Sequence, residues 1–162
     1  MFIFELVNRF SLSLVFDTLS DLSFAVPSNN TCKDAILHSY TGSCNFQTYS
    51  NDSSTQSNDA SPSCALNYST DIWFKVLVPT NGVLVIDTRY MNVCISMAAY
   101  TGACGSLTQY TCDKSSSVDY QMPYFYIEDK SIANDTLFIQ IWGYKGKTGY
   151  FRVCISPLST KQ

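Results

Sequence analysis

The stretch that decides the fold class is residues 71–88, which read DIWFKVLVPTNGVLVIDT. Its first half alternates with a period of two, which is the period of a β-strand. One side of the chain carries Ile72, Phe74, Val76 and Val78. Asn81-Gly82, shortly after Pro79, is the pair most typical of a tight hairpin turn. We therefore expect two strands, over 71–79 and 82–88, paired as a hairpin.

The rest of the chain repeats this pattern of short strands and polar turns. Ser and Thr together occupy 36 positions and Tyr and Phe 21, a composition that favours strands over helices. Further strands are expected over 92–102, 104–112, 120–129, 136–144 and 150–157, the last two as a final hairpin. Eight or nine strands with turns about every ten residues predict an all-β fold, an antiparallel β-sandwich of jelly-roll type stapled by disulfides.

Length and charge exclude several classes of protein. The chain has 162 residues, enough for one domain with a short appendage. We divide it into an N-terminal strand segment, 1–26, and a β-sandwich, 27–162. Ten basic residues against thirteen acidic ones give a net charge of -3, and no basic run exists, so nucleic acid is not an expected partner.

Cysteines and sequons indicate an oxidising, extracellular location. Seven cysteines without the paired spacing of zinc sites predict disulfides in a secreted protein, with at least one cysteine left over. Cys104 and Cys112 bracket an expected short hairpin and are close enough in sequence to staple it. Covalent glycans are predicted at four Asn-x-Ser/Thr sequons, whose asparagines are Asn29, Asn51, Asn67 and Asn134.

Residues 1–25 allow two interpretations. Ser23-Phe24-Ala25 has the small residues that a signal peptidase accepts, but the acidic Glu5, Asp17 and Asp21 interrupt the stretch before it. It is also too short and too charged to span a membrane. We expect the segment to be retained as a strand whose apolar side carries Leu12, Leu14 and Phe16. Such a strand can close its own sheet or complete the sheet of a neighbouring subunit.

Two further stretches suggest exposed surfaces. Residues 48–63, TYSNDSSTQSNDASPS, have almost no apolar content, so we expect a loop that projects into water and adds nothing to a core. In residues 120–129, Tyr124 and Tyr126 alternate with Phe125 and Ile127. Core packing explains the two tyrosines most simply; the alternative is an exposed pair that stacks on sugar rings.

Three segments together resemble a known family: residues 71–88, AAYTGACGSLTQYTCD (98–113) and FIQIWGYKGKTGYFRVCI (138–155). They are similar to β-sandwich modules related to bacterial pre-peptidase C-terminal domains, especially the cysteine-containing repeats of Bacteroidetes surface proteins. The opening SNNTCKDAI (28–36) resembles the entry of the same modules, so the resemblance covers about residues 27–157. It implies a non-catalytic accessory, adhesive or cell-surface unit.

The resemblance also implies particular cysteine roles. Cys94 stands where the family usually has an aspartate, and Asp113-Lys114 replaces an acidic pair, so the calcium site of some relatives is not expected here. Cys94 is then the candidate for the unpaired or interchain cysteine. The remaining bridges implied by the resemblance are Cys32–Cys154 and Cys44–Cys64.

Little in the sequence points to catalysis. His38 is the only histidine and lies near no nucleophile motif, so neither an enzyme nor a metal or other cofactor is expected. The first expected function is a structural glycoprotein subunit that assembles with copies of itself by inserting its N-terminal strand into a neighbour. The alternative is a secreted module that binds extracellular carbohydrate through Tyr124 and Tyr126.

Overall fold

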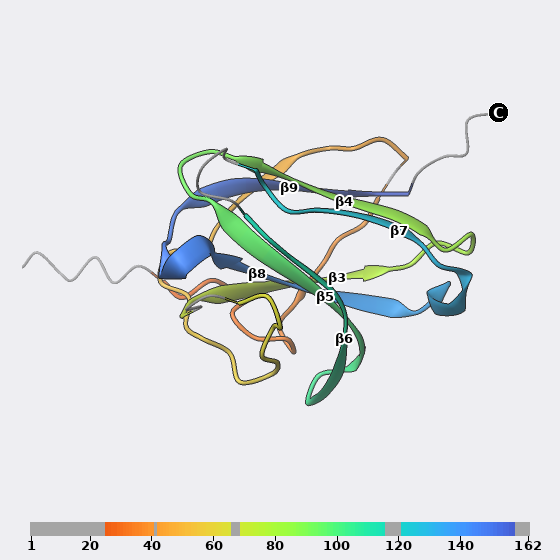
Figure 1. Cartoon of the computed structure of the whole chain (residues 1–162), viewed down its shortest axis with the longest axis horizontal. Coiled ribbons are helices and arrows are strands. Elements are labelled where there is room, and N and C mark those ends of the chain that lie inside the picture. Colours follow the sequence, from red (N-terminus) through yellow and green to blue (C-terminus); the bar gives the residue numbers. More distant parts are fainter. Residues whose placement is uncertain (1–24, 41, 66–68, 116–120, 158–162) are drawn as a thin grey trace, which may run out of the picture.

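The computed structural model describes residues 25–157 apart from residues 41, 66–68 and 116–120. This part of the chain is all-β, with nine strands and two single-turn 3-10 helices, η1 (Lys130–Ile132) and η2 (Tyr144–Gly146) (Figure 1). The strands are β1 (Ile36–Leu37), β2 (Gln47–Ser50), β3 (Asp71–Leu77), β4 (Val83–Tyr90), β5 (Ile95–Ala103), β6 (Ser106–Lys114), β7 (Tyr124–Glu128), β8 (Thr136–Gly143) and β9 (Tyr150–Ser156). The expected N-terminal strand, with Leu12, Leu14 and Phe16, lies outside the described residues.

The strands form two facing sheets, so the predicted β-sandwich is confirmed (Figure 1). One sheet has five strands in the order β1-β3-β8-β5-β6, and the other has four in the order β2-β9-β4-β7. All pairs are antiparallel except β1 with β3. The alternating apolar side chains meet between the sheets, as the period of two requires. The largest of them in this core are Phe74, Phe151, Phe125, Met97, Ile72, Leu84, Ile86, Ile95, Leu137 and Ile139.

Two of the expected hairpins are wrong because their strands belong to different sheets. β3 pairs with β1 and β8, whereas β4 pairs with β7 and β9, so the turn at Pro79–Gly82 crosses from one sheet to the other. Only Gly82 of the Asn-Gly pair has a left-handed φ, +73°, and a side chain there would collide with the backbone of Asp129. β8 and β9 are separated in the same way. β5 and β6 do pair as a hairpin.

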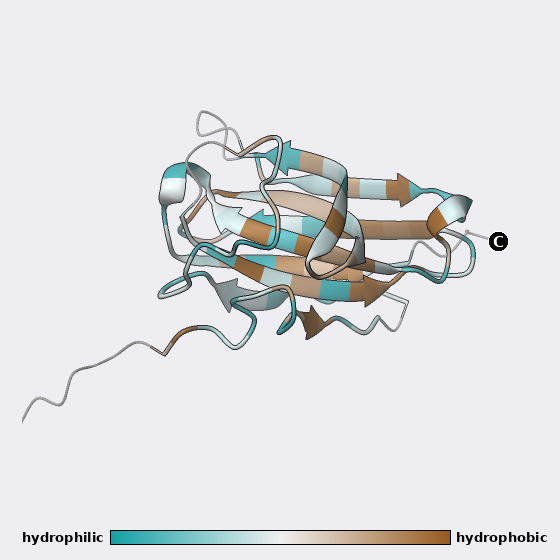
Figure 2. Cartoon of the chain, turned by 90° about the horizontal axis from the view of Figure 1, so that it is seen from below, coloured by the Kyte–Doolittle hydropathy of each residue, from teal (hydrophilic) through white to brown (hydrophobic). Residues whose placement is uncertain are grey.

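A second, smaller core covers the outer face of the five-stranded sheet. Trp73, Trp142 and Tyr100 point away from the sandwich interior and are at most 2% exposed. The segment between β2 and β3 covers them, and Figure 2 shows pale and teal loops crossing in front of the strands on this side. The expectation that residues 48–63 project into water is therefore wrong: residues 47–50 form β2, and Asn51, Ser54, Ser57 and Pro62 are buried.

Candidate functional site

A cavity of about 330 Å³ opens on the side of the sandwich where β1 and β2 are the edge strands. Its floor includes Tyr49 and Ile155, which belong to or pack against the main core. The other lining side chains come from β1, from β2 and from the segment between them: Leu37, His38, Ser39, Tyr40, Ser43, Asn45 and Gln47. None of these lining residues is Asp, Glu, Lys or Arg. The cavity therefore has no formally charged side chain in its lining. Tyr49 and Ile155 make its core side apolar, and most of the other lining side chains are polar.

His38 lines this cavity directly after β1. Its backbone N–H donates to the Lys75 carbonyl oxygen at 2.8 Å, which extends the β1–β3 ladder by one residue. Its Nδ1 is buried and has no hydrogen-bond partner of good geometry among the described residues. Burial lowers the pKa of His38, and a contact with the backbone of Ser39 opposes this in part. The imidazole is thus biased towards its neutral form, which has one donor and one acceptor nitrogen.

The opposite side of the sandwich, between β6 and β7, is bridged by side chains. The Tyr110 hydroxyl donates to the Asp129 carboxylate at 3.1 Å, and the backbone N–H of Tyr124 donates to the Asp113 carboxylate at 3.3 Å. Below them, the Ser115 hydroxyl donates to the Gln121 carbonyl oxygen at 2.6 Å. Hydrogen bonds from Ser131 lower the pKa of Asp129, so it stays ionised. The two sheet edges on this side are therefore tied together by acidic groups.

Tyr124 and Tyr126 lie on the solvent-facing side of β7, 49% and 50% exposed, while Phe125 and Ile127 face the core. The core-packing interpretation of the two tyrosines is therefore wrong. Tyr126 is paired in register with Val85, an outward-facing residue of β4 that is 8% exposed. The Tyr126 hydroxyl donates to Glu128 at 3.0 Å, and this bond raises the pKa of the tyrosine. The pair forms an aromatic surface with acidic neighbours.

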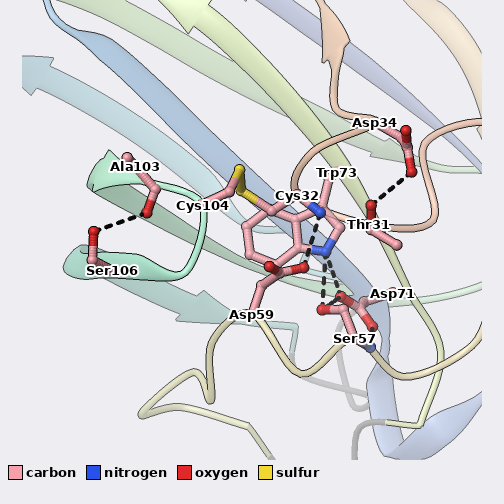
Figure 3. The surroundings of a disulfide bond; sticks show 10 residues. All are labelled: Thr31, Cys32, Asp34, Ser57, Asp59, Asp71, Trp73, Ala103, Cys104 and Ser106. Carbon is pink, nitrogen blue, oxygen red and sulfur yellow. Dashed lines mark hydrogen bonds between the residues drawn. A yellow bond between two sulfur atoms is a disulfide. The ribbon is translucent and has the colours of Figure 1, made fainter.

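A buried carboxylate organises the second core beneath the β2–β3 segment. Asp71 is fully buried at the start of β3 and accepts hydrogen bonds from the Ser57 backbone and hydroxyl, at 2.7 and 2.6 Å. The indole Nε1 of Trp73 donates at 2.7 Å (Figure 3). The Gln140 amide donates at 2.9 Å. Gln140 in turn accepts from the Tyr100 hydroxyl at 2.7 Å. The network holds a polar loop on an aromatic surface, and its role is structural.

Sequence reasoning did not find this network or the cavity. A signal for the network was present in Gln140, which interrupts the apolar run 137–142, because buried polar residues require partners. Asp71, at the start of an expected strand, gave a weaker signal. For the cavity no such signal exists, since β1 and β2 meet only through the topology of the two sheets.

The structure has three disulfides, Cys32–Cys104, Cys44–Cys154 and Cys64–Cys112, with Cα–Cα distances of 5.6 to 5.9 Å. The expected Cys104–Cys112 bridge is wrong. Cys104 lies in the turn between β5 and β6, and Cys112 lies far along the extended β6. Eight residues of strand span roughly 26 Å, against the roughly 7 Å that a disulfide allows between Cα atoms.

The two bridges implied by the resemblance, Cys32–Cys154 and Cys44–Cys64, are also wrong. Cys32 and Cys64 belong to the outer layer of the five-stranded sheet. Cys154 lies on the outer side of the four-stranded sheet, where Cys44 covers it. The sandwich separates the members of each expected pair. Cys94 is the free cysteine and is half-buried, and an interchain bridge through it stays a prediction.

Two of the four sequons are incompatible with glycosylation of the folded chain. Asn29 is 4% exposed and continues the sheet edge: its amide donates to the Trp73 carbonyl oxygen at 3.0 Å, and its carbonyl accepts from the Trp73 N–H at 2.8 Å. Asn51 is fully buried and bonds to Thr70, Lys147 and Gly149. Glycosylation at these two sites is a wrong expectation. Asn134 is exposed, and Asn67 lies outside the described residues.

In the described part of the chain, no three His, Cys, Asp or Glu side chains come together as a set that could hold a metal ion. Nor does any helix of residues 25–157, gaps excepted, have the length and apolarity to cross a membrane. Comparison of the chain with protein families, with curated proteins and with solved structures finds no match. The cavity and the tyrosine surface are two features of the described residues that could receive a partner.

Proposed function

We propose that the chain is an extracellular structural subunit that assembles with copies of itself into a filament or surface layer, by inserting residues 10–16 as a strand into a neighbouring subunit. The observation that supports this most is the unequal closure of the two sides of the sandwich. The β6/β7 side is bridged by side chains, whereas the β1/β2 side is hollow down to the core residues Tyr49 and Ile155. An open sheet edge is a template for another strand.

Insertion of one subunit's strand into the next gives a head-to-tail contact. Such a contact uses two different surfaces of each copy, so it propagates as a fibre unless the rotation closes a ring. Three disulfides support an oxidising, extracellular setting, with glycans proposed at Asn134 and Asn67. The strand orders β2-β9-β4-β7 and β3-β8-β5-β6 support a jelly roll as the finer description of the sandwich.

Deletion of residues 1–25 should abolish assembly and leave a folded monomer. All nine strands and all three disulfides lie after residue 25, so the deletion removes none of them. Assembly is measured by electron microscopy and sedimentation of the full chain and of the deleted chain. Circular dichroism and non-reducing mass spectrometry check that the deleted chain keeps its strands and disulfides. Fibres from the deleted chain would refute the proposed mechanism.

The second candidate function is carbohydrate binding at the tyrosine surface, and the exposure of Tyr124 and Tyr126 favours it. Flat aromatic rings beside carboxylates are the usual elements of a sugar site, because the ring packs on the sugar face and the acid accepts from hydroxyls. Glu128 accepts from the Tyr126 hydroxyl and Asp113 accepts from the Tyr124 backbone N–H, so each tyrosine has a carboxylate as a neighbour. A subunit of a surface layer could carry such a site as an adhesive function.

Replacing either tyrosine with alanine should weaken binding of a retained glycan by roughly tenfold, the effect of losing about 1.4 kcal/mol of stacking. A glycan array identifies the ligand, and calorimetry compares Tyr124→Ala and Tyr126→Ala with the parent chain. Tyr150→Ala is the matched control, because Tyr150 is equally exposed at 49% but lies on β9, two strands from β7. Equal losses at all three tyrosines, or retention of no glycan, would exclude this site.

We propose no catalytic role. His38 shares its cavity with Ser39 and Ser43, yet no residue lining that cavity is an acid that could orient the imidazole as in a Ser-His-Asp triad. The surroundings of the only histidine favour binding over chemistry.

A further inference from the structure

We propose that the edge of β2, together with the cavity beside it, is the acceptor site for residues 10–16 of a second copy of the chain. This inference rests on the proposed function and assigns its receiving surface. Each sheet has two edge strands, β1 and β6 in one sheet and β2 and β7 in the other, so there are four possible acceptors among the described residues. Three observations select β2.

The first observation is the direction of the backbone groups. The Asn51 N–H donates to the Gly149 carbonyl oxygen, in register with the β2–β9 ladder. Because directions alternate along a strand, Tyr49 and Gln47 also face β9, and the N–H and C=O of Thr48 face the open edge. β1 has only two residues, and beyond it the Tyr40 hydroxyl donates to the Leu77 carbonyl oxygen of β3. β2 therefore offers the longer unpaired ladder on this side of the sandwich.

The second observation is charge. Residues 10–16, FSLSLVF, contain no charged side chain, and the residues lining the cavity contain none besides the titratable His38. The rival edges on the other side carry Asp113, Glu128 and Asp129. An apolar strand placed there would desolvate these carboxylates without offering them a cation, which is costly. The uncharged segment matches the uncharged hollow.

The third observation is the pattern of side chains that each surface requires. A strand added beside β2 directs alternate residues towards the sandwich interior and the others to solvent. Leu12, Leu14 and Phe16 would then cover the floor formed by Tyr49 and Ile155, with Ser11 and Ser13 in the outer row beside Thr48.

Two variants separately disable the strand that is inserted and the β2 edge that receives it. Thr48→Pro removes the outward N–H of β2 while the bonds to β9 remain, and proline is tolerated at such edge positions. Leu12→Asp/Leu14→Asp places two carboxylates on the apolar side of residues 10–16 and so prevents their insertion as the donor strand. We expect each full-length variant alone to be monomeric, whereas an equal mixture forms a 1:1 heterodimer, because one partner keeps its donor and the other its acceptor. Mass photometry counts the species.

Tyr126→Pro is the matched control, because the Asp129 N–H bonds to Gly82 of the β4 side and Tyr126 therefore also faces an open edge, that of β7. It should form fibres like the parent chain. Fibres from Thr48→Pro, with none from the chain lacking residues 1–25, would overturn the β2 assignment and leave the proposed function standing. Fibres from the deleted chain overturn the function itself. A monomeric parent whose residues 10–16 resist hydrogen exchange would show that the strand closes its own sheet and would overturn both.

A cross-link keeps the proposal testable if Thr48→Pro does not fold. In a Cys94→Ser background, Ser13→Cys and Thr48→Cys place one thiol on the solvent side of the inserted strand and one on the solvent side of β2. A disulfide between them requires Cα atoms within about 7 Å, which adjacent strands satisfy. We expect a ladder of linked chains on non-reducing gels, with Ser11→Cys covering the alternative register. Ser13→Cys combined with Tyr126→Cys should give none. A ladder with Tyr126→Cys and not with Thr48→Cys would transfer the acceptor to β7.

Discussion

Replacing Asp71 with alanine should destabilise the domain by about 3–5 kcal/mol, because it leaves several buried donors unsatisfied at about 1–3 kcal/mol each. The carboxylate is fully buried and accepts four hydrogen bonds, from two groups of Ser57, from Trp73 and from Gln140. An alanine leaves the Ser57 and Gln140 donors without this acceptor, and the Trp73 indole keeps only its 3.1 Å bond to the Ser57 hydroxyl. The β2–β3 segment should lose its position together with its anchor.

The measurement is the free energy of unfolding from urea titration under oxidising conditions. Asp71→Asn retains one acceptor oxygen, but its new amide N–H faces the N–H and O–H groups that Asp71 accepts from. The free energy of unfolding should therefore fall by less than in Asp71→Ala, but measurably. Asp135→Ala is the control, because Asp135 is exposed and bonds to Val78 and Ile132 through its backbone. Its effect on the free energy of unfolding should lie within about 0.5 kcal/mol. Equal stability of Asp71→Ala and Asp135→Ala would show that the network contributes nothing.

Removal of the Cys44–Cys154 disulfide, by Cys44→Ser/Cys154→Ser, should cost about 4–5 kcal/mol in the chain-entropy description. This bridge closes the longest loop of the three, with a sequence separation of 110. It also fastens the segment before β2 to β9, so its loss should loosen the edge strand that we assign as the acceptor.

The same urea titration compares this double variant with the parent chain, and Cys94→Ser serves as the control for losing a thiol that forms no bridge. Hydrogen exchange should rise first in residues 42–50. If the free energy of unfolding falls by no more than it does in Cys94→Ser, the noncovalent contacts of β2 suffice to hold β2 in place.

The sequence predicted the strands better than their partners. The alternation in residues 71–77 and 83–88 is a local property and gave β3 and most of β4 correctly. Whether two neighbouring strands pair or separate into opposite sheets depends on contacts far along the chain, such as β3 with β8 and β4 with β9. The Asn81-Gly82 turn suits both outcomes, so the hairpin expected there was wrong.

The site was predictable only where a residue's own chemistry decides its place. The cysteine count predicted disulfides with one cysteine left over, and the family resemblance correctly pointed to Cys94 as that cysteine. The pairing of the other six follows from which sheet face each one occupies, and no spacing reveals that. The sequons at Asn29 and Asn51 were misleading because an amide that can carry a glycan can equally serve as a buried partner for backbone groups. Residues 48–63 were misread for the same reason: their hydroxyls and amides bond inward.

The pairing of the cysteines decides which part of the chain could bear mechanical load. A pull on the segments before Cys32 and after Cys154 follows the shortest covalent path, which runs along residues 32–44 and across the Cys44–Cys154 bond. Residues 45–153, with β2 to β8 and most of β9, carry no tension while that bond is intact. Its reduction would move the path to the Cys32–Cys104 bond and residues 104–154, which adds on the order of 125 Å at about 3.3 Å per residue. A chain held by these two segments would therefore extend little when oxidised and would lengthen under force when reduced.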